Sequence, residues 1–292
     1  MDMVVEVDRI PGAGETVLGG DLHRVPGGKG ANQAVAAARL GRSVAMVGRV
    51  GDDENGEMLR AALEHDGVDT THLVTTPRVP TGVALIAVGV DGDNSIVVSP
   101  GANIHLGPDD LVLATDLISQ ASCVLLQLEI PLAAVAAGVQ AAEGTVILNP
   151  APAPDGALPA ALSSRVDVLV PNQTELASLA GYDGSVDVEM AAELARTLPV
   201  ASVVVTLGAA GALVVGPDAV HVAAPAVTPV DTTGAGDSFC AALADGIVAG
   251  RSLLEATRWA VRVGAATTLR SGAQPSLPTA AEVDSRLAGA SS

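Results

Sequence analysis

Apolar residues along this chain follow two periods that alternate with each other. Short continuous apolar runs predict buried strands over residues 43–51, 123–129, 145–150, 166–172 and 202–208. Apolar positions at helical spacing predict helices over residues 31–40, 56–67, 131–144, 173–181, 191–198, 236–249 and 253–269. Strands that alternate with helices predict an α/β fold with a doubly wound, mostly parallel sheet and helices on both faces.

Two β-rich regions interrupt this alternation. The first 25 residues contain strand-like segments at 3–7 and 15–25, separated by glycine and proline. Residues 81–103 contain two β-type runs joined by Asp91–Asn94, whose Asp-Gly pair predicts a hairpin turn. Another hairpin is predicted over 211–224. Neither a repeat nor a linker divides the chain, so we predict one domain over residues 1–292.

Four predicted strands end on polar residues, namely Glu129, Asn149, Asn172 and Thr206. In open α/β sheets, ligands bind beyond the carboxyl ends of the strands. Four polar strand ends in one chain therefore favour a shared cleft over coincidence.

Composition narrows the function classes. The net charge of −18 argues against a nucleic-acid partner, because binding of the phosphate backbone needs a basic protein surface. An anionic ligand would need local positive potential from a helix N-terminus, a metal or a lone cation. No apolar run approaches the length of a membrane span, so no membrane association is expected. Two cysteines without a signal peptide predict a reduced, cytoplasmic protein.

The strongest candidate motif is "DTTGAGDSF", Asp231–Phe239, at the start of a predicted helix. Backbone amides at Gly234, Ala235 and Gly236 would favour an anion there. Asp237 would repel a phosphate, but it could take a proton from an attacking hydroxyl. The alternative is that Asp237 caps the helix and the glycines form a turn.

The segment "GGKGANQA" contains the only lysine of the chain, Lys29. Its glycines, Gly28 and Gly30 among them, allow close backbone approach, while Lys29 and Asn32 offer polar groups to sugar hydroxyls. The spacing of a Walker A phosphate loop is absent. The alternative is a flexible turn with a solvated lysine.

The segment "VPNQTE" places Glu175 three residues after Asn172, at the start of a helix. Glu175 could hold Mg²⁺ through water, and Asn172 could meet a nucleotide phosphate. A helix-capping pattern is the alternative. The glycine-rich strand end "TLGAAG", Thr206–Gly211, could approach a phosphate or a ribose.

These motifs, in this order, resemble the ribokinase family of carbohydrate kinases, of phosphofructokinase-B type. The resemblance covers nearly the full length and rests on "GGKGANQAVAAARLG", "TGVALI", "QLEIP", "LNPAPAP", "PNQTE", "TLGAAG", "DTTGAGDSF" and "GAQPS". It implies ATP-dependent phosphorylation of ribose at O5. Deoxyribose, fructose or a nucleoside are alternative substrates, and a non-catalytic sugar-binding protein is the alternative from another class.

The resemblance also implies roles for matching residues. Asp237 would be the base, and the amides of Gly234, Ala235 and Gly236 would stabilise the transferring phosphoryl group. The sugar would contact Asp2, Gly28, Lys29, Gly30, Asn32, Glu129 and Asp237. The nucleotide would contact Asn172, Thr206, Leu207, Gly208, Ala209, Ala210, Gly211 and Gly236. Glu175 would organise Mg²⁺ with ATP. A K⁺ ion would be held by oxygens of Asp231, Thr233, Thr267, Arg270, Gly272 and Ser276.

Two further expectations come from the resemblance. Residues 2–28 and 81–103 would form a β-sheet lid over the sugar, and two copies would pair through it as a homodimer. In the family a strand ending in N-x-D precedes the lid. Here Asp2 matches its aspartate, and the preceding strand is missing. We expect a start codon placed too late or a shortened chain, which the upstream DNA would reveal.

Overall fold

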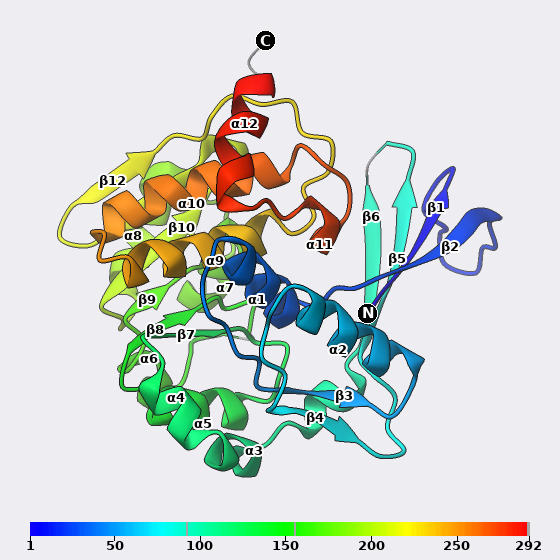
Figure 1. Ribbon diagram of the computed structural model, residues 1–292. Helices are drawn as coiled ribbons and strands as arrows, with labels where there is room; N and C mark the ends of the chain where they lie inside the picture. Colours follow the sequence, from blue (N-terminus) through cyan, green and yellow to red (C-terminus); the bar gives the residue numbers. More distant parts are fainter. Residues whose placement is uncertain (92, 155, 291–292) are drawn as a thin grey trace.

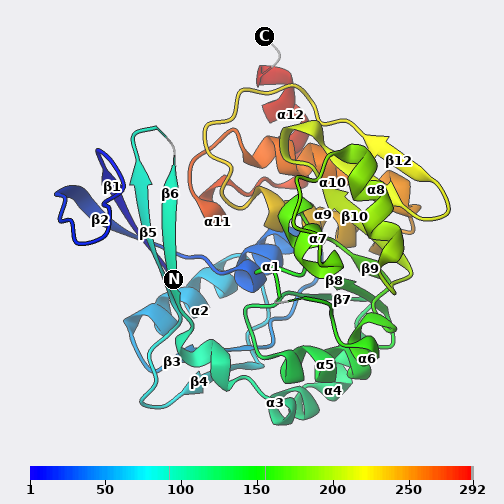
Figure 2. The same ribbon diagram turned by 180° about the vertical axis from the view of Figure 1, so that it is seen from behind.

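The computed structural model describes residues 1–91, 93–154 and 156–290 (Figure 1, and Figure 2 from behind). The strands are β1 (Asp2–Val7), β2 (Gly19–Val25), β3 (Gly48–Gly51), β4 (Leu73–Thr76), β5 (Val83–Gly89), β6 (Asn94–Ser99), β7 (Cys123–Leu126), β8 (Thr145–Leu148), β9 (Val168–Leu169), β10 (Ser202–Thr206), β11 (Ala212–Val215) and β12 (Ala219–Val222). The α-helices are α1 (Lys29–Arg39), α2 (Glu54–His65), α3 (Pro108–Leu113), α4 (Thr115–Gln120), α5 (Leu132–Ala141), α6 (Ala160–Ser163), α7 (Gln173–Ala180), α8 (Val188–Thr197), α9 (Ala235–Val248), α10 (Leu253–Thr267), α11 (Ala273–Ser276) and α12 (Ala280–Ala290). Two 3₁₀ turns are η1 (Gly101–His105) and η2 (Gly208–Ala210).

The largest sheet has six strands in the order β12-β11-β10-β9-β8-β7. Strands β7 to β10 are parallel, whereas β11 and β12 pair antiparallel at one edge. Side chains alternate between the faces: Val204 packs in one apolar core, and Val203 and Val205 pack in another. Both faces of this sheet are therefore buried.

Helices cover both faces, as predicted. Helices α9, α10 and α12 contribute to the core on one side, and α5 to α8 contribute to the cores on the other. Figures 1 and 2 show α9, α10 and α12 across the sheet from α3, α4 and α5. No helix in the described ranges is both long and apolar enough to cross a membrane.

The two β-rich regions come together in a four-stranded sheet, β2-β1-β5-β6, which projects from the body (Figure 1). Strand β1 pairs parallel with β5 and antiparallel with β2. The predicted β5–β6 hairpin is present, and Gly92 of its predicted turn lies outside the described residues. The sheet thus joins segments that lie far apart in the sequence.

The structure corrects the sheet prediction in three respects. The parallel strands fall into two sheets, because β3 and β4 form a separate parallel pair and β7 is the edge of the six-stranded sheet. The predicted strand 43–51 is regular only at 48–51, with an isolated bridge from Ala45 to Asp69. The predicted strand 166–172 shrinks to two residues, since Pro171 cannot donate to a ladder.

Candidate active site

Helix α9 begins at the glycine-rich segment and carries a buried carboxylate in its first turn. Gly234 is the N-cap, with a φ of 77° that favours glycine. The side chain of Asp237 follows in that turn, and the residue is 8% exposed. The amide of Ala235 donates to the carbonyl oxygen of Thr232 at 3.2 Å. A Cβ on Gly236 would meet no atom within 4 Å, so Gly236 leaves room for a ligand at the positive helix end.

Helix α1 packs against α9 and holds the carboxylate of Asp237 from its buried side. The side-chain amide of Asn32 donates to Oδ2 of Asp237 at 2.9 Å, and that of Gln33 donates to Oδ1 at 3.1 Å. Burial raises the pKa of the Asp237 carboxyl, although the ammonium of Lys29 and the two amide donors each lower it. The carboxylate is thus oriented by neutral donors at an unusually dry position.

The start of α1 gathers the predicted sugar-binding groups. Gly28 has a φ of 93°, and the amide of Lys29 donates to Oε2 of Glu129 at 2.9 Å. The side-chain oxygen of Asn32 is buried and has no hydrogen-bond partner among the described residues. Burial of such an acceptor without a partner is unfavourable, and a sugar hydroxyl would supply the missing donor.

Asp2 belongs to the same surroundings. A Cβ on Gly27 would lie 2.1 Å from a carboxylate oxygen of Asp2, so the two residues fit together only because position 27 is glycine. Burial raises the pKa of the Asp2 carboxyl, and the negative charge of Asp237 raises it further. Asp2 therefore lies within electrostatic range of the buried carboxylate.

A cavity of about 220 Å³ joins these groups to the strand ends. Its polar lining includes Lys29, Asn149, Asn172, Thr206 and Asp237, and Glu175 and Gly236 also line it. Three of the four polar strand ends that sequence analysis assigned to a shared cleft therefore lie in one cavity. The fourth, Glu129, reaches it through the amide of Lys29.

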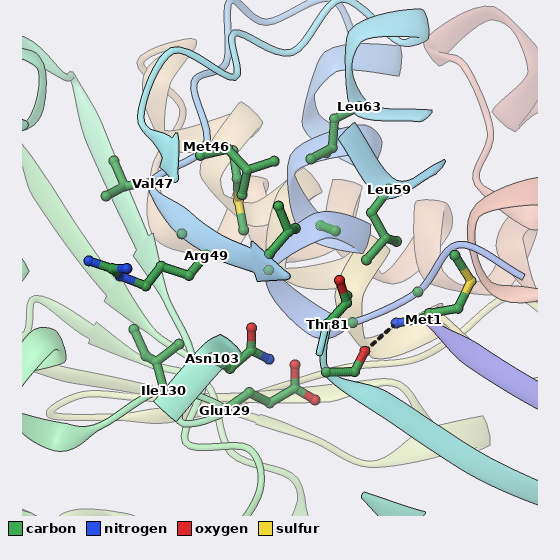
Figure 3. A pocket seen from close by; sticks show the side chains of 18 of the residues that line it. Met1, Met46, Val47, Arg49, Leu59, Leu63, Thr81, Asn103, Glu129 and Ile130 are labelled. Carbon is green, nitrogen blue, oxygen red and sulfur yellow. Dashed lines mark hydrogen bonds between the residues drawn. The ribbon is translucent and has the colours of Figure 1, made fainter. Parts of the chain in front are cut away.

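A second cavity, of about 110 Å³, borders the same turn of α1 (Figure 3). Gly28, Gly30 and Glu129 line it together with apolar side chains that include Met46 and Leu59. Figure 3 shows Glu129 across the cavity from these apolar side chains. Of the predicted sugar-binding residues, Gly28, Gly30 and Glu129 thus line the largely apolar cavity, and Lys29 and Asp237 line the polar one.

Of the predicted nucleotide-binding residues, Asn172, Thr206 and Gly236 line the larger cavity. Asn172 and Thr206 are joined by an isolated parallel bridge, which brings two strand ends side by side. The turn Gly208–Ala210 follows, and Gly211 has a φ of 100° with space for no Cβ, since one would lie 2.1 Å from the carbonyl oxygen of Val222. Leu207 is buried in the core, so only its backbone is available to a ligand.

Asn172 and Glu175 form the helix-capping pattern that the sequence offered as the alternative to a ligand site. The side chain of Asn172 accepts from the amide of Glu175 at 2.8 Å, and Glu175 accepts from the amide of Asn172 at 2.9 Å. Burial raises the pKa of the Glu175 carboxyl, whereas the amide of Asn172 and the charge of Lys29 lower it. This carboxylate therefore caps α7 and also faces the cavity.

The segments 231–233 and 267–276 meet beside the start of α9. The carboxylate of Asp231 accepts from the amides of Thr233 at 2.8 Å and Gly272 at 2.7 Å. Burial would raise the pKa of Asp231, but these hydrogen bonds lower it below its ordinary value. The carboxylate of Asp231 thus joins the two segments in its ionised form.

Other predicted K⁺ ligands present their side chains elsewhere. The hydroxyl of Thr267 donates to the carbonyl oxygen of Val263, and that of Ser276 donates to the carbonyl oxygen of Ala273. Arg270 forms an ion pair with Glu282. The guanidinium of Arg270 cannot ligate a cation, whereas the hydroxyl oxygens of Thr267 and Ser276 keep lone pairs for one.

Comparison with known sequences identifies the family. Residues 1–280 match the family described as pfkB family carbohydrate kinase. The chain belongs to the pfkB family of carbohydrate kinases. A carbohydrate kinase is a phosphotransferase, so the chain is an enzyme of that class.

Individual pfkB-family relatives match over nearly the whole chain. Ribokinase of Bacillus subtilis is 40% identical over 291 residues, which cover 98% of this chain and 96% of the relative. Deoxyribokinase of Salmonella typhimurium is 35% identical, covering 96% of this chain and 93% of the relative. The structure of Arabidopsis thaliana ribokinase complexed with ribose and ATP has a TM-score of 0.87 at 34% identity, covering 98% of this chain and 95% of that one. This likeness confirms the predicted fold.

The donor chemistry of the site suits the cations that a pfkB-family kinase implies. Mg²⁺ prefers oxygen ligands and keeps several waters, and Glu175 offers a buried carboxylate in the cavity wall. Beside α9, the carboxylate of Asp231 offers oxygen, a donor that suits a hard cation. Glu175 and Asp231 therefore carry the kind of donor that the assigned ions take, and the ion sites stay predictions.

Two glutamines next to the site were missed by sequence reasoning. Gln33 is 1% exposed and contacts Asp237, and Gln127 donates to Gln33. A signal for Gln33 was present, because it is a polar residue on the buried, alanine-rich face of α1. Gln127 follows an apolar strand and gave no such signal, since its partner lies 94 residues away.

Proposed function

We propose that this enzyme catalyses ATP-dependent phosphorylation of D-ribose at O5, giving ribose 5-phosphate and ADP. The single observation that carries the proposal is the position of Asp237. Its carboxylate is bonded to Asn32 on the predicted sugar side, and it lines the cavity that Gly236 opens on the predicted phosphate side. The names of the ribokinase relatives support ribose as the acceptor.

In this mechanism Asp237 is the general base. As the O5 oxygen of ribose attacks the γ-phosphorus of ATP, its proton passes to the carboxylate, an oxygen–phosphorus bond forms, and the bond to ADP breaks. The base must be ionised to accept the proton. Burial raises the pKa of Asp237, so the base becomes protonated as the pH is lowered. We therefore expect turnover to be lost on acidification at a higher pH than for an aspartate with an ordinary pKa.

The backbone at the start of α9 would stabilise the transferring phosphoryl group. The amides of Gly234, Ala235 and Gly236 form the proposed anion hole, with the helix dipole behind them. The amide of Ala235 would have to leave Thr232 to contribute fully. Lys29 lines the same cavity, so its ammonium lies at the junction of the sugar and phosphate sides.

We assign the remaining predicted contacts to the same two sides. The sugar would be held by Asp2, Gly28, Lys29, Gly30, Asn32 and Glu129, which gather at the start of α1. The nucleotide would contact Asn172, Thr206, Leu207, Gly208, Ala209, Ala210, Gly211 and Gly236, which lie around the strand ends of β9 and β10 and the start of α9. In both sets, glycines let the ligand approach the backbone closely.

Glu175 would hold Mg²⁺ through water, and oxygens of Asp231, Thr233, Thr267, Arg270, Gly272 and Ser276 would hold K⁺. When bound, these ions supply positive charge next to the phosphates. The chain's own residues position them: Asp231 joins the two segments beside the anion hole, and Glu175 is fixed by its cap.

We propose one domain over residues 1–292, with a lid formed by residues 2–28 and 81–103. Both faces of the lid sheet carry exposed apolar side chains, with Leu85 and Val97 on one face and Ile96 and Val98 on the other. One face can cover the sugar, and the other is free to pair with a second copy as a homodimer. We place the reaction in the cytoplasm, where free thiols such as Cys123 and Cys240 stay reduced.

Deoxyribose is the second candidate substrate, because a deoxyribokinase is 35% identical over nearly the whole chain. A coupled assay of ADP release against ribose, deoxyribose, fructose and nucleosides, with and without K⁺, tests the proposal. Fastest release with ribose supports it. Preference for another sugar would move the assignment within the family, and release with none of them would favour sugar binding without catalysis.

A further inference from the structure

Four side-chain and backbone groups form a hydrogen-bonded chain that ends at Asp237. The side-chain nitrogen of Asn149, Nδ2, donates to the backbone carbonyl oxygen of Val170 at 2.9 Å. The side-chain nitrogen of Gln33, Nε2, donates to the side-chain oxygen of Asn149 at 3.3 Å and to Oδ1 of Asp237 at 3.1 Å. The amide nitrogen of Gln127 donates to the side-chain oxygen of Gln33. Residues at the ends of β7 and β8 and in α1 therefore support one carboxylate.

The direction of this chain is set at its far end. A backbone carbonyl can only accept, so Asn149 must turn its nitrogen toward Val170 and its oxygen toward Gln33. Gln33 must then face both Asn149 and Asp237 with its nitrogen, whose two hydrogens satisfy the two acceptors. Its oxygen is left for Gln127. A reversed Gln33 amide would bring oxygen against oxygen at two places.

We infer that Gln33 is a positioning residue for the catalytic base, locked by the Val170–Asn149 pair so that it always presents an N–H donor to Asp237. Asp237 accepts from Asn32 at its other oxygen, so both oxygens are held and the carboxylate plane is fixed. Donors favour the ionised form of a carboxylate. Gln33 thus orients the base and keeps it ionised in a dry site. This inference rests on the proposed role of Asp237.

Other charged groups face Asp237 and act on the same equilibrium. The ammonium of Lys29 favours its ionised form, whereas the negative charges of Asp2, Glu129 and Glu175 oppose it. Cys240, one turn along α9, is buried and has a raised pKa, so it stays neutral. The N-terminal ammonium of Met1 interacts with Asp2 and Glu129 and offsets part of their charge, and neutral donors such as Gln33 further favour the ionised form of Asp237.

The decisive experiment is the pH dependence of kcat in the Gln33→Leu enzyme. Removal of one hydrogen bond to a charged group should move the acid limb of kcat upward by about one pH unit. At pH values above the limb, kcat should stay below that of wild type, because the carboxylate plane is then held by one donor fewer. An unmoved limb would overturn the inference. Gln140→Leu makes the same change on the exposed side of α5 and should leave the limb unmoved.

A second variant and a direct titration keep the test independent of folding and of turnover. Gln33→Glu preserves shape but replaces the donor by a carboxylate, so its acid limb should move further than that of Gln33→Leu. In protein labelled with ¹³C-aspartate, the carboxyl NMR signal of Asp237 is identified as the one that is missing from the Asp237→Asn spectrum. The pH dependence of that signal reports the ionisation of Asp237 directly. Its midpoint should rise in both Gln33 variants, and an unchanged midpoint would refute the role of Gln33. Agreement between this midpoint and the kinetic limb in wild type tests the base assignment separately.

Discussion

Replacing Asp237 with asparagine tests the proposed chemistry most directly. Asparagine has the shape of aspartate but cannot take up the proton from the sugar hydroxyl. General base catalysis typically contributes about 10²–10⁴-fold, so kcat should fall by about a thousandfold, equivalent to about 4 kcal/mol in the barrier. All the proposed nucleotide contacts except Gly236 come from elements other than α9, so the affinity for ADP should stay within about threefold of wild type.

The structure also bounds the effect of this change on stability. Both oxygens of Asp237 accept amide donors, so the new NH₂ group must face a donor, which costs about 1–3 kcal/mol. The raised pKa means that the ionised carboxylate destabilises the fold at neutral pH, and the substitution removes that penalty. The two effects oppose each other, so the Tm should change by only a few degrees.

The assay is ADP release with saturating ribose, Mg²⁺ and K⁺, with ADP binding measured by calorimetry on the same preparation. Turnover within tenfold of wild type would remove Asp237 from the role of base. Loss of both turnover and ADP binding would point instead to a structural role at the start of α9. Only loss of kcat with intact nucleotide binding fits the proposed mechanism.

Four further substitutions probe the surroundings of the base. Lys29→Ala should raise the KM for sugar more than the KM for ATP, measured by ADP release, and the opposite order would place Lys29 with the nucleotide. Gly236→Ala should keep the wild-type Tm, because its Cβ meets open space, but lower kcat at least tenfold by crowding the phosphoryl group. Gly211→Ala should instead lower the Tm by several degrees, because its Cβ would overlap a backbone carbonyl. Asp231→Asn should weaken activation of ADP release by K⁺ and the rise in Tm that K⁺ causes, and equal responses to K⁺ in both enzymes would argue against the cation site.

Local patterns predicted the elements well. The alternation of periods located seven of the described helices to within about three residues, but it missed α3, α4, α6, α11, α12 and strand β4. The polar strand ends Asn149, Asn172 and Thr206 do line one cavity. These predictions succeed because parallel strands place their carboxyl ends at one edge of a sheet, whatever the details of packing. The capping box at Asn172 was also readable, since its partners are three residues apart.

Contacts between distant segments were not readable in the same way. The lid sheet pairs β1 with β5, and their register depends on how the two regions meet in space. The division of the parallel strands into two sheets was likewise missed, because an apolar run reports that a strand is buried but not which neighbour it pairs with.

Local patterns were enough to identify the residues of the site: the glycine-rich helix start, Asp237 within it, and Lys29 and Asn32 in the first turn of α1. How Asp237 is held depends on contacts that form only in the folded chain. Gln33 is 204 residues from Asp237, and the direction of its amide depends on Val170, a backbone carbonyl on a third segment. Hydrogen-bond direction is a property of the assembled network, because each amide is oriented by the partner beyond it.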